Sequence, residues 1–179
     1  MARGPFDQTN NMSTTTAITA YPLTVSMWIR TPDRSTSDIA FSLTETTGDW
    51  LSITQIAGGA IRVTTVDFTV NQGSATTTNI VSNDTWHHVC GVWLSASSRT
   101  AFIDGGDKTT DTTNVSANIA GMDELEIGHF RNSAANDGLD IAEVGIWNVA
   151  LSDEEVATLG KGFSCHLIRP QSLVHHMPL

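Results

Sequence analysis

The stretch that decides the fold is Leu23-Thr24-Val25-Ser26-Met27-Trp28-Ile29-Arg30, which is followed by the turn sequence Thr31-Pro32-Asp33. Apolar side chains recur at every second position from Leu23 to Ile29. Successive side chains of a β-strand point to opposite faces, so this spacing gathers the apolar side chains on one face. The stretch therefore predicts a half-buried strand that ends before Pro32.

Short runs of the same kind follow, and turn sequences such as Thr47-Gly48-Asp49 and Ala57-Gly58-Gly59 separate them. Such turns are typical of hairpins between antiparallel strands. We expect further strands at residues 38–43, 50–56, 60–67, 85–95, 99–104, 124–130 and 139–147. Eight or more short strands at this spacing predict an all-β fold of two packed antiparallel sheets.

One helix signal occurs late in the chain. Ser152 and Glu155 have the spacing of a capping box, in which the serine is the N-cap and the glutamate is the third helical residue. Val156 and Leu159 supply a buried stripe, and a glycine soon afterwards can end the helix. We expect one short C-terminal surface helix of about two turns.

The length of 179 residues fits one domain, which we place at residues 1–162. Residues 163–179 form a tail that is too apolar for a solvated linker. Pro170 and Pro178 exclude a continuous helix there. We expect an extended tail that docks on the domain or on a partner subunit.

Composition and charge restrict the partners. Only 16% of the residues are charged, and serine and threonine fill about 40 positions, which favours strands and turns. The 9 basic and 19 acidic residues give a formal net charge of −10, so we expect no nucleic acid partner. No apolar run is long enough to span a membrane, and the first residues lack the apolar stretch of a signal peptide.

The two cysteines, Cys90 and Cys165, are far apart and form no CxxC motif, which excludes a zinc ribbon and a disulfide scaffold. A single long-range disulfide stays open as the minority alternative. We expect Cys90 to be a buried free thiol, because its strand face also carries Val92 and Leu94.

Three segments resemble the laminin-G-like, concanavalin A-like lectin/glucanase superfamily, especially the variants found in bacteriophage and marine bacterial proteins. They are PLTVSMWIRTPD at 22–33, TWHHVCGVWLSASSRTAFIDGG at 85–106 and GLDIAEVGIWNVALSDEEVATLGKG at 138–162. The resemblance implies a jelly-roll sandwich, and it spans most of the chain.

The adjacent histidines and the tryptophans have mainly structural interpretations. Strand alternation makes His87 and His88 point apart, so we expect a core or turn-bonding role for each and not a shared metal. Trp28 and Trp147 lie among apolar strand residues and are expected to pack in the core. Trp50, beside the turn residue Asp49, is the better candidate for an exposed aromatic platform.

The sequence argues against catalysis. A retaining glucanase needs two carboxylates about 5 to 5.5 Å apart, and enzymes that the chain resembles place theirs in a Glu-x-Asp-x-Glu arrangement. Here Glu124 and Glu126 share one strand face, but position 128 is glycine. We therefore interpret the two glutamates as residues of a solvent-exposed strand face. We expect no catalytic residues, and we expect that the protein is not an enzyme.

Calcium is the one cofactor that we expect, as a structural ion. The resemblance implies a Ca²⁺ ion at the rim of the sandwich, and Ca²⁺ binds six to eight oxygen ligands. Among the turn-borne acids, Asp33, Asp137 and Asp140 are the candidate ligands. Asx hydrogen bonds that cap turns are the alternative role for each.

We expect a non-catalytic recognition or assembly module on a virion surface, as a phage head decoration or a fibre-associated protein. Its partners would be a glycan or other virion or cell-surface proteins, and it would form a homo-oligomer or associate with a capsid. The candidate ligand-binding residues are Trp50, Asp49, Asn132 and Asn136. The alternatives are a secreted, extracellular bacterial carbohydrate-binding lectin domain and a glucanase relative.

Overall fold

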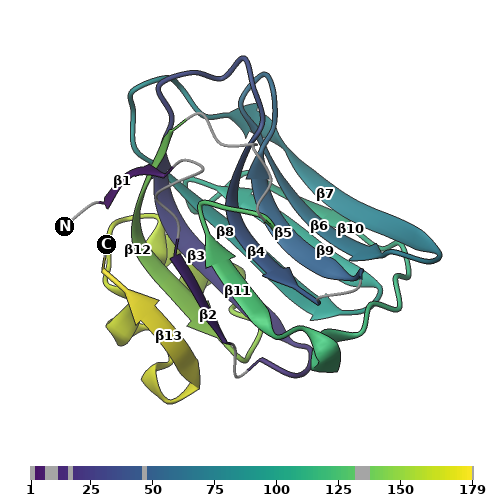
Figure 1. The fold of residues 1–179 in the computed structure, drawn as a ribbon. Coiled ribbons are helices and arrows are strands. Elements are labelled where there is room, and N and C mark those ends of the chain that lie inside the picture. The colour runs from purple at the N-terminus through teal and green to yellow at the C-terminus, as the bar shows by residue number, and fades with distance from the viewer. Residues whose placement is uncertain (1–2, 7–11, 16–17, 46–47, 132–137, 179) are drawn as a thin grey trace.

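The protein is a sandwich of two antiparallel sheets (Figure 1). It was analysed as a computed structural model that describes residues 3–6, 12–15, 18–45, 48–131 and 138–178. The all-β jelly-roll prediction is confirmed. In the described residues, no helix is both long enough and apolar enough to cross a membrane.

The first sheet has seven strands, and β12 is paired on both sides. Its main order is β1 (Arg3–Phe6), β12 (Leu139–Trp147), β3 (Leu23–Arg30), β8 (His87–Ser95), β9 (Ser98–Ile103) and β10 (Lys108–Asp111). The last strand of the chain, β13 (Leu173–Met177), also pairs with β12. Because β3 occupies one side of β12, β1 and β13 share the other, at different halves of the strand.

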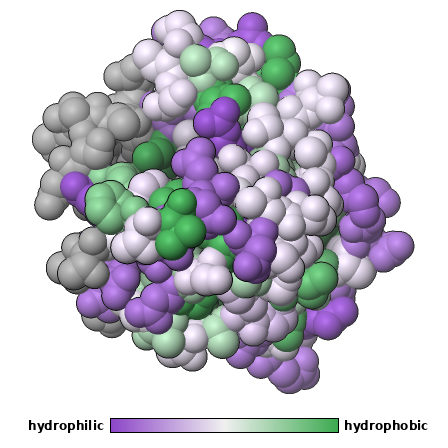
Figure 2. Space-filling view, turned by 90° about the vertical axis from the view of Figure 1, so that its right-hand side faces the viewer, coloured by the Kyte–Doolittle hydropathy of each residue, from purple (hydrophilic) through white to green (hydrophobic). Residues whose placement is uncertain are grey.

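The second sheet has six strands. Its order is β2 (Met12–Thr15), β11 (Glu124–Ile127), β4 (Asp38–Thr44), β5 (Trp50–Gln55), β6 (Ala60–Asp67) and β7 (Asn71–Ile80). Figure 2 shows the side of the molecule near β7 and β10, where hydrophobic side chains form separate small groups among hydrophilic and neutral ones.

The main core lies between the sheets. From the first sheet, Leu23, Val25, Met27 and Ile29 of β3 are at most 1% exposed. Their neighbours in the same cluster include Phe41, Leu51 and Ile53 of the second sheet. The apolar alternation of β3 therefore faces the core, as its sequence predicts.

A second apolar cluster covers the other face of the first sheet, so the prediction that β3 is half-buried is wrong for its first half. Thr24 and Ser26 are also buried. The Thr24 hydroxyl donates to the Val149 carbonyl at 2.8 Å and accepts from the Leu151 amide at 3.0 Å. The cluster consists of Cys90, Val92, Phe102, Trp147, Leu151, Val156, Leu159 and Cys165.

The predicted helix is α1 (Asp153–Leu159), and its capping box is confirmed. The Glu155 amide donates to the Ser152 hydroxyl at 3.4 Å, and the Ser152 amide donates to the Glu155 carboxylate at 2.7 Å. Val156 and Leu159 are the buried residues of α1 and belong to the second cluster.

The chain after α1 packs on its own domain. It forms the short 3-10 turns η2 (Cys165–Leu167) and η3 (Pro170–Ser172) and then β13, which runs antiparallel to β12 (Figure 1). The Trp147 indole donates to the Ile168 carbonyl at 2.8 Å. A third 3-10 turn, η1 (Ile119–Gly121), precedes β11.

Candidate functional site

Of the candidates that the structure describes, Asp49 and Trp50 lie at one end of the second sheet and Asp33 lies near its other end, whereas Asp140 belongs to β12 of the first sheet. Asp49 and Trp50 stand at the beginning of β5. Asp33 lies in the loop before β4, near the end of β5, where the Gln55 side chain donates to the Thr36 carbonyl at 3.2 Å. The candidates Asn132, Asn136 and Asp137 lie outside the described residues.

Trp50 packs with Phe130 and Arg131 on the outer face of the second sheet. Its neighbour Leu51 is buried in the core, so alternation directs Trp50 to the opposite face. The Phe130 ring stands edge-on to the indole, with ring centroids 5.4 Å apart. The Arg131 guanidinium lies 5.5 Å from the Trp50 ring centroid. All three side chains are half-buried.

Asp49 holds two loops in place. One of its carboxylate oxygens accepts from the Phe68 amide at 3.0 Å, and the other accepts from the Asn118 amide at 2.7 Å. The first bond fixes the hairpin between β6 and β7, where Phe68 is 66% exposed, and the second fixes the loop before η1. We define the Trp50 cluster as Asp49, Trp50, Phe68, Asn118, Phe130 and Arg131.

Glu126 is buried, so the prediction of a solvated carboxylate pair is wrong for this residue. Its side chain is 5% exposed and pairs with the His129 ring at 2.8 Å. The other carboxylate oxygen accepts from the Ser42 hydroxyl at 3.2 Å and from the Arg131 amide at 2.9 Å. The chain after β11 contacts these groups and closes over them. Glu124 is exposed, as predicted.

The acids at the other end have local partners. Both carboxylate oxygens of Asp33 accept from Ser35, one from the amide at 2.8 Å and one from the hydroxyl at 2.6 Å. These hydrogen bonds lower the pKa of Asp33. Asp140 pairs with Arg30, whose Nε lies 2.7 Å away. Among the described residues, no cluster of three or more potential metal-binding side chains includes either acid, so calcium stays a prediction.

The two adjacent histidines point apart, as the strand alternation predicts. His87 bonds the turn before β8 through the Ser82 amide at 3.0 Å, and its other nitrogen lies 2.9 Å from the Asp104 carboxylate. His88 is buried, and its Nε2 lies 2.8 Å from the Ser26 hydroxyl. Burial lowers the pKa of His88 to about 4.

A different group gathers potential metal ligands in the part of the chain that the structure describes: Glu143, Cys165 and His176. Sequence reasoning missed it, because Glu143 is remote in sequence from the other two. One sequence signal could have indicated it: the otherwise apolar tail contains two dipeptides of potential metal ligands, Cys165-His166 and His175-His176, and is therefore rich in Cys and His.

Two facing antiparallel sheets, with an aromatic cluster on an outer face, define a lectin-like jelly-roll domain. The chain belongs to the concanavalin A-like lectin/glucanases superfamily, whose laminin G model matches residues 6–157. No curated protein sequence matches the chain significantly.

Solved structures of low sequence identity share the fold. A heptameric SAP-like pentraxin from Limulus polyphemus has a TM-score of 0.68 at 16% identity, over 89% of this chain and 81% of the pentraxin. Domain 4 of the arabinanase AbnA from Geobacillus stearothermophilus, solved with arabinotriose, has a TM-score of 0.63 at 16% identity. The match covers 82% of this chain and 69% of the arabinanase domain. Domains LG4-5 of the mouse laminin α1 chain have a TM-score of 0.67 at 15% identity, over 86% of this chain and 43% of that fragment.

Proposed function

We propose that this domain is a non-catalytic recognition module that binds a neutral oligosaccharide at the Trp50 cluster. The observation that carries the proposal is the contact of Trp50 with Phe130 and Arg131 at one end of the sandwich, where the hydrogen bond from the Phe68 amide to Asp49 holds the exposed Phe68 in the adjoining hairpin. Binding sites for small ligands combine aromatic walls with a few placed polar groups that set orientation. The apolar face of a sugar ring can stack on the aromatic side chains, and its hydroxyls can form hydrogen bonds with the polar groups.

The polar partners of the cluster suit a neutral ligand. The Arg131 guanidinium is already engaged by main-chain oxygens, including that of Asp49 at 3.2 Å, and by the faces of two rings. The net charge of −10 disfavours the approach of an anionic ligand. The arabinotriose complex of the structurally similar arabinanase domain supports a neutral oligosaccharide as the ligand class.

The environment of Glu126 supports a non-catalytic role. A glycosidase needs its carboxylates at the substrate, as acid and nucleophile or base. Glu126 is enclosed, and both of its oxygens bond to protein groups. Its neighbour on the same face, Glu124, is solvent-exposed and has no such enclosure. We therefore assign Glu126 to holding the residues after β11 against the sheet.

An array of neutral and sialylated oligosaccharides tests this function, with arabinotriose and N-acetylneuraminic acid included as probes. We expect binding of at least one neutral glycan, and a loss of about 10-fold or more in affinity for both Trp50→Ala and Phe68→Ala. Leu94→Ala is the matched control, because Leu94 is 56% exposed and lies outside the cluster. Absence of glycan binding, or equal binding by all variants, would overturn the proposal.

We further propose that the module is displayed on a virion surface, with a secreted bacterial lectin domain as the alternative. The support is the resemblance of three segments of the chain to phage and marine bacterial variants of the superfamily. A multivalent assembly would strengthen weak glycan contacts, and the similar pentraxin is heptameric. Mass spectrometry of purified particles from the source should detect the chain in intact virions, whereas detection only in the cell-free medium would contradict this placement.

A further inference from the structure

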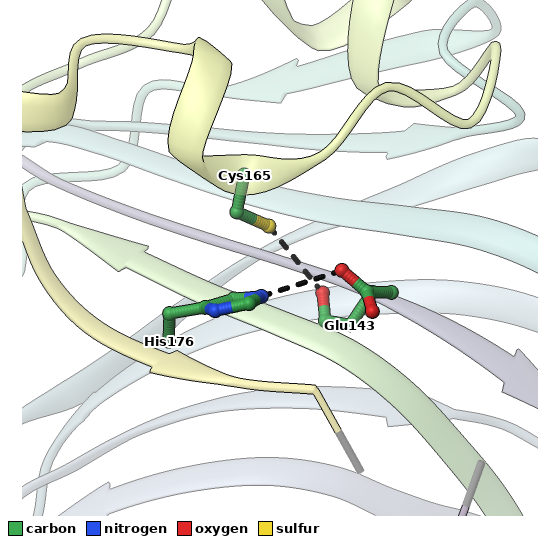
Figure 3. Close-up of side chains that lie close together, drawn as sticks. All are labelled: Glu143, Cys165 and His176. Atoms are coloured by element: carbon green, nitrogen blue, oxygen red, sulfur yellow. Dashed lines mark hydrogen bonds and ion pairs between the residues drawn. The ribbon is translucent and has the colours of Figure 1, made fainter. Parts of the chain in front are cut away.

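Three side chains from three separate elements converge at the end of the chain (Figure 3). Glu143 comes from β12, Cys165 from η2 and His176 from β13. Each offers one ligand atom, and these atoms all lie within 4.8 Å of one another. The His176 Nε2 is 3.3 Å from a Glu143 carboxylate oxygen, and the Cys165 thiol points at the Glu143 carbonyl oxygen, 3.6 Å away.

The backbone of β12 is irregular at this place. The register of β12 with β3 shifts between Ala142 and Gly145, and Glu143 adopts a φ of 50°, a left-handed conformation that is uncommon for a residue with a side chain. A bulge redirects side chains and often lies next to a functional site. Gly145 is needed beside it, because a Cβ there would lie 2.6 Å from the Cys165 sulfur.

We propose that Glu143, Cys165 and His176 bind a zinc ion. Thiolate, imidazole and carboxylate together are a typical donor set for Zn²⁺, whereas Ca²⁺ takes oxygen ligands only. Zinc ligands stand about 2.0 to 2.3 Å from the ion, so the donors of a tetrahedral site are separated by about 3.3 to 3.8 Å. The observed separations therefore need a movement of about 1 Å, which rotation of the side chains can supply.

The site would fasten the end of the chain to the sandwich. Two of its ligands lie after α1, and the third lies on the strand that the end of the chain pairs with. The ring of His166 contacts that of His176, with centroids 4.2 Å apart, but His166 is not part of the three-residue group, so a water molecule would take the fourth position on the ion. Binding of zinc adds to folding stability when the ligands are brought together only in the folded state. This role is independent of the Trp50 cluster.

Titration of the reduced, metal-free full chain with zinc alone tests the proposal. Native mass spectrometry should show one zinc ion per folded chain, and competition with a chromophoric chelator should give its affinity. Cys165→Ser and His176→Asn should each lower the affinity by at least about 100-fold, since loss of a residue that merely supports a ligand already costs 10- to 100-fold.

Two matched variants serve as controls. Cys90→Ala removes the other thiol, and His175→Asn removes the neighbouring imidazole on the opposite face of β13. Both should bind zinc as the wild type does. If a ligand variant fails to fold, Glu143→Gln gives a second test, because its side chain is 39% exposed.

Binding of cobalt in place of zinc detects the metal–sulfur bond directly. A Cys165 that served only in packing would give no such signal. Thiolate-to-cobalt charge-transfer absorption should appear with the wild type and with Cys90→Ala, and it should be absent with Cys165→Ser. Lack of zinc binding by the folded wild type, or equal affinity of the ligand variants and the controls, would overturn the proposal.

Discussion

Arg99 illustrates how a single charged residue is accommodated inside the sandwich. Its side chain is fully buried, and its guanidinium donates to the Ala96 and Thr113 carbonyls at 2.8 and 2.9 Å and pairs with Asp111. Gly73 leaves the space for this group, since a Cβ there would lie 1.8 Å from the guanidinium. Sequence patterns gave no indication of this pair, because it joins neighbouring strands through side chains that periodicity does not distinguish from exposed ones.

Asp111→Ala should lower the free energy of unfolding by about 3 kcal/mol, because it leaves a buried guanidinium without its counter-charge. Urea unfolding measures the loss. Asp153→Ala is the matched control: it breaks the exposed pair with Lys108, where about 0 to 1 kcal/mol is expected. Equal losses in the two variants would contradict the importance of burial for the Arg99 pair.

His88 should make stability depend on pH. Burial lowers its pKa from 6.5 to about 4, although the Asp104 carboxylate opposes this shift. Because the folded-state pKa lies below the unfolded one, the unfolded chain binds more protons between these values. The free energy of unfolding should therefore fall by about 3 kcal/mol as the pH drops from 6.5 to 4.

Urea unfolding of the wild type and of His88→Gln across this pH window isolates the contribution of His88. In the variant, the free energy of unfolding should fall much less between pH 6.5 and pH 4 than it does in the wild type. An identical pH dependence in both proteins would mean that other groups cause it.

At the scale of elements, the strands with alternating apolar residues could be predicted closely from the sequence. The predicted ranges 60–67 and 139–147 coincide with β6 and β12. β7 was missed because its sequence, NQGSATTTNI, carries almost no apolar alternation, although it pairs with β6 along most of its length. Pairing with β6, and not an apolar pattern of its own, therefore determines that the Thr-rich β7 is a strand.

Removal of residues 163–179 should destabilise the domain, because it uncovers Trp147 and leaves half of one side of β12 unpaired. We expect a lower melting temperature and a red shift of tryptophan fluorescence in the remaining native state. Loss of a large buried apolar contact typically costs about 3 to 5 kcal/mol.

Phe163→Ser is the control for this truncation, since the Phe163 side chain is 52% exposed and should matter little. A truncated chain with the stability of the wild type would contradict the docking of this segment in solution.

At the scale of the whole molecule, family membership and sheet architecture followed from sequence, but the grouping of site residues did not. Asp49 and Trp50 could be singled out from their turn, yet their partners Phe130 and Arg131 reach them through bends of the chain just after β11. Asp33 lies at the other end of the sandwich. Strand periodicity assigns faces, but the distances between loops depend on how both sheets pack.

Calcium binding at the Asp33 end stays a prediction that chelators can test. Protein saturated with Ca²⁺ should melt at a lower temperature after excess of a calcium-selective chelator is added, by mass action. The fold, followed by circular dichroism, should stay the same. An unchanged melting curve would exclude a tight calcium site, and the same measurement on Cys165→Ser separates this effect from that of the Cys165 site.

The central claim is that the domain binds a glycan at the Trp50 cluster without cleaving it. Residue-resolved NMR titration with arabinotriose, or with the neutral glycan that the array identifies, tests it most directly, because the five tryptophans give separate indole signals. The account predicts that the Trp50 signal and the amides of Asp49 and Phe68 shift while the sugar signals show no hydrolysis. Shifts confined to the Asp33 end, or the appearance of cleaved sugar, would contradict it.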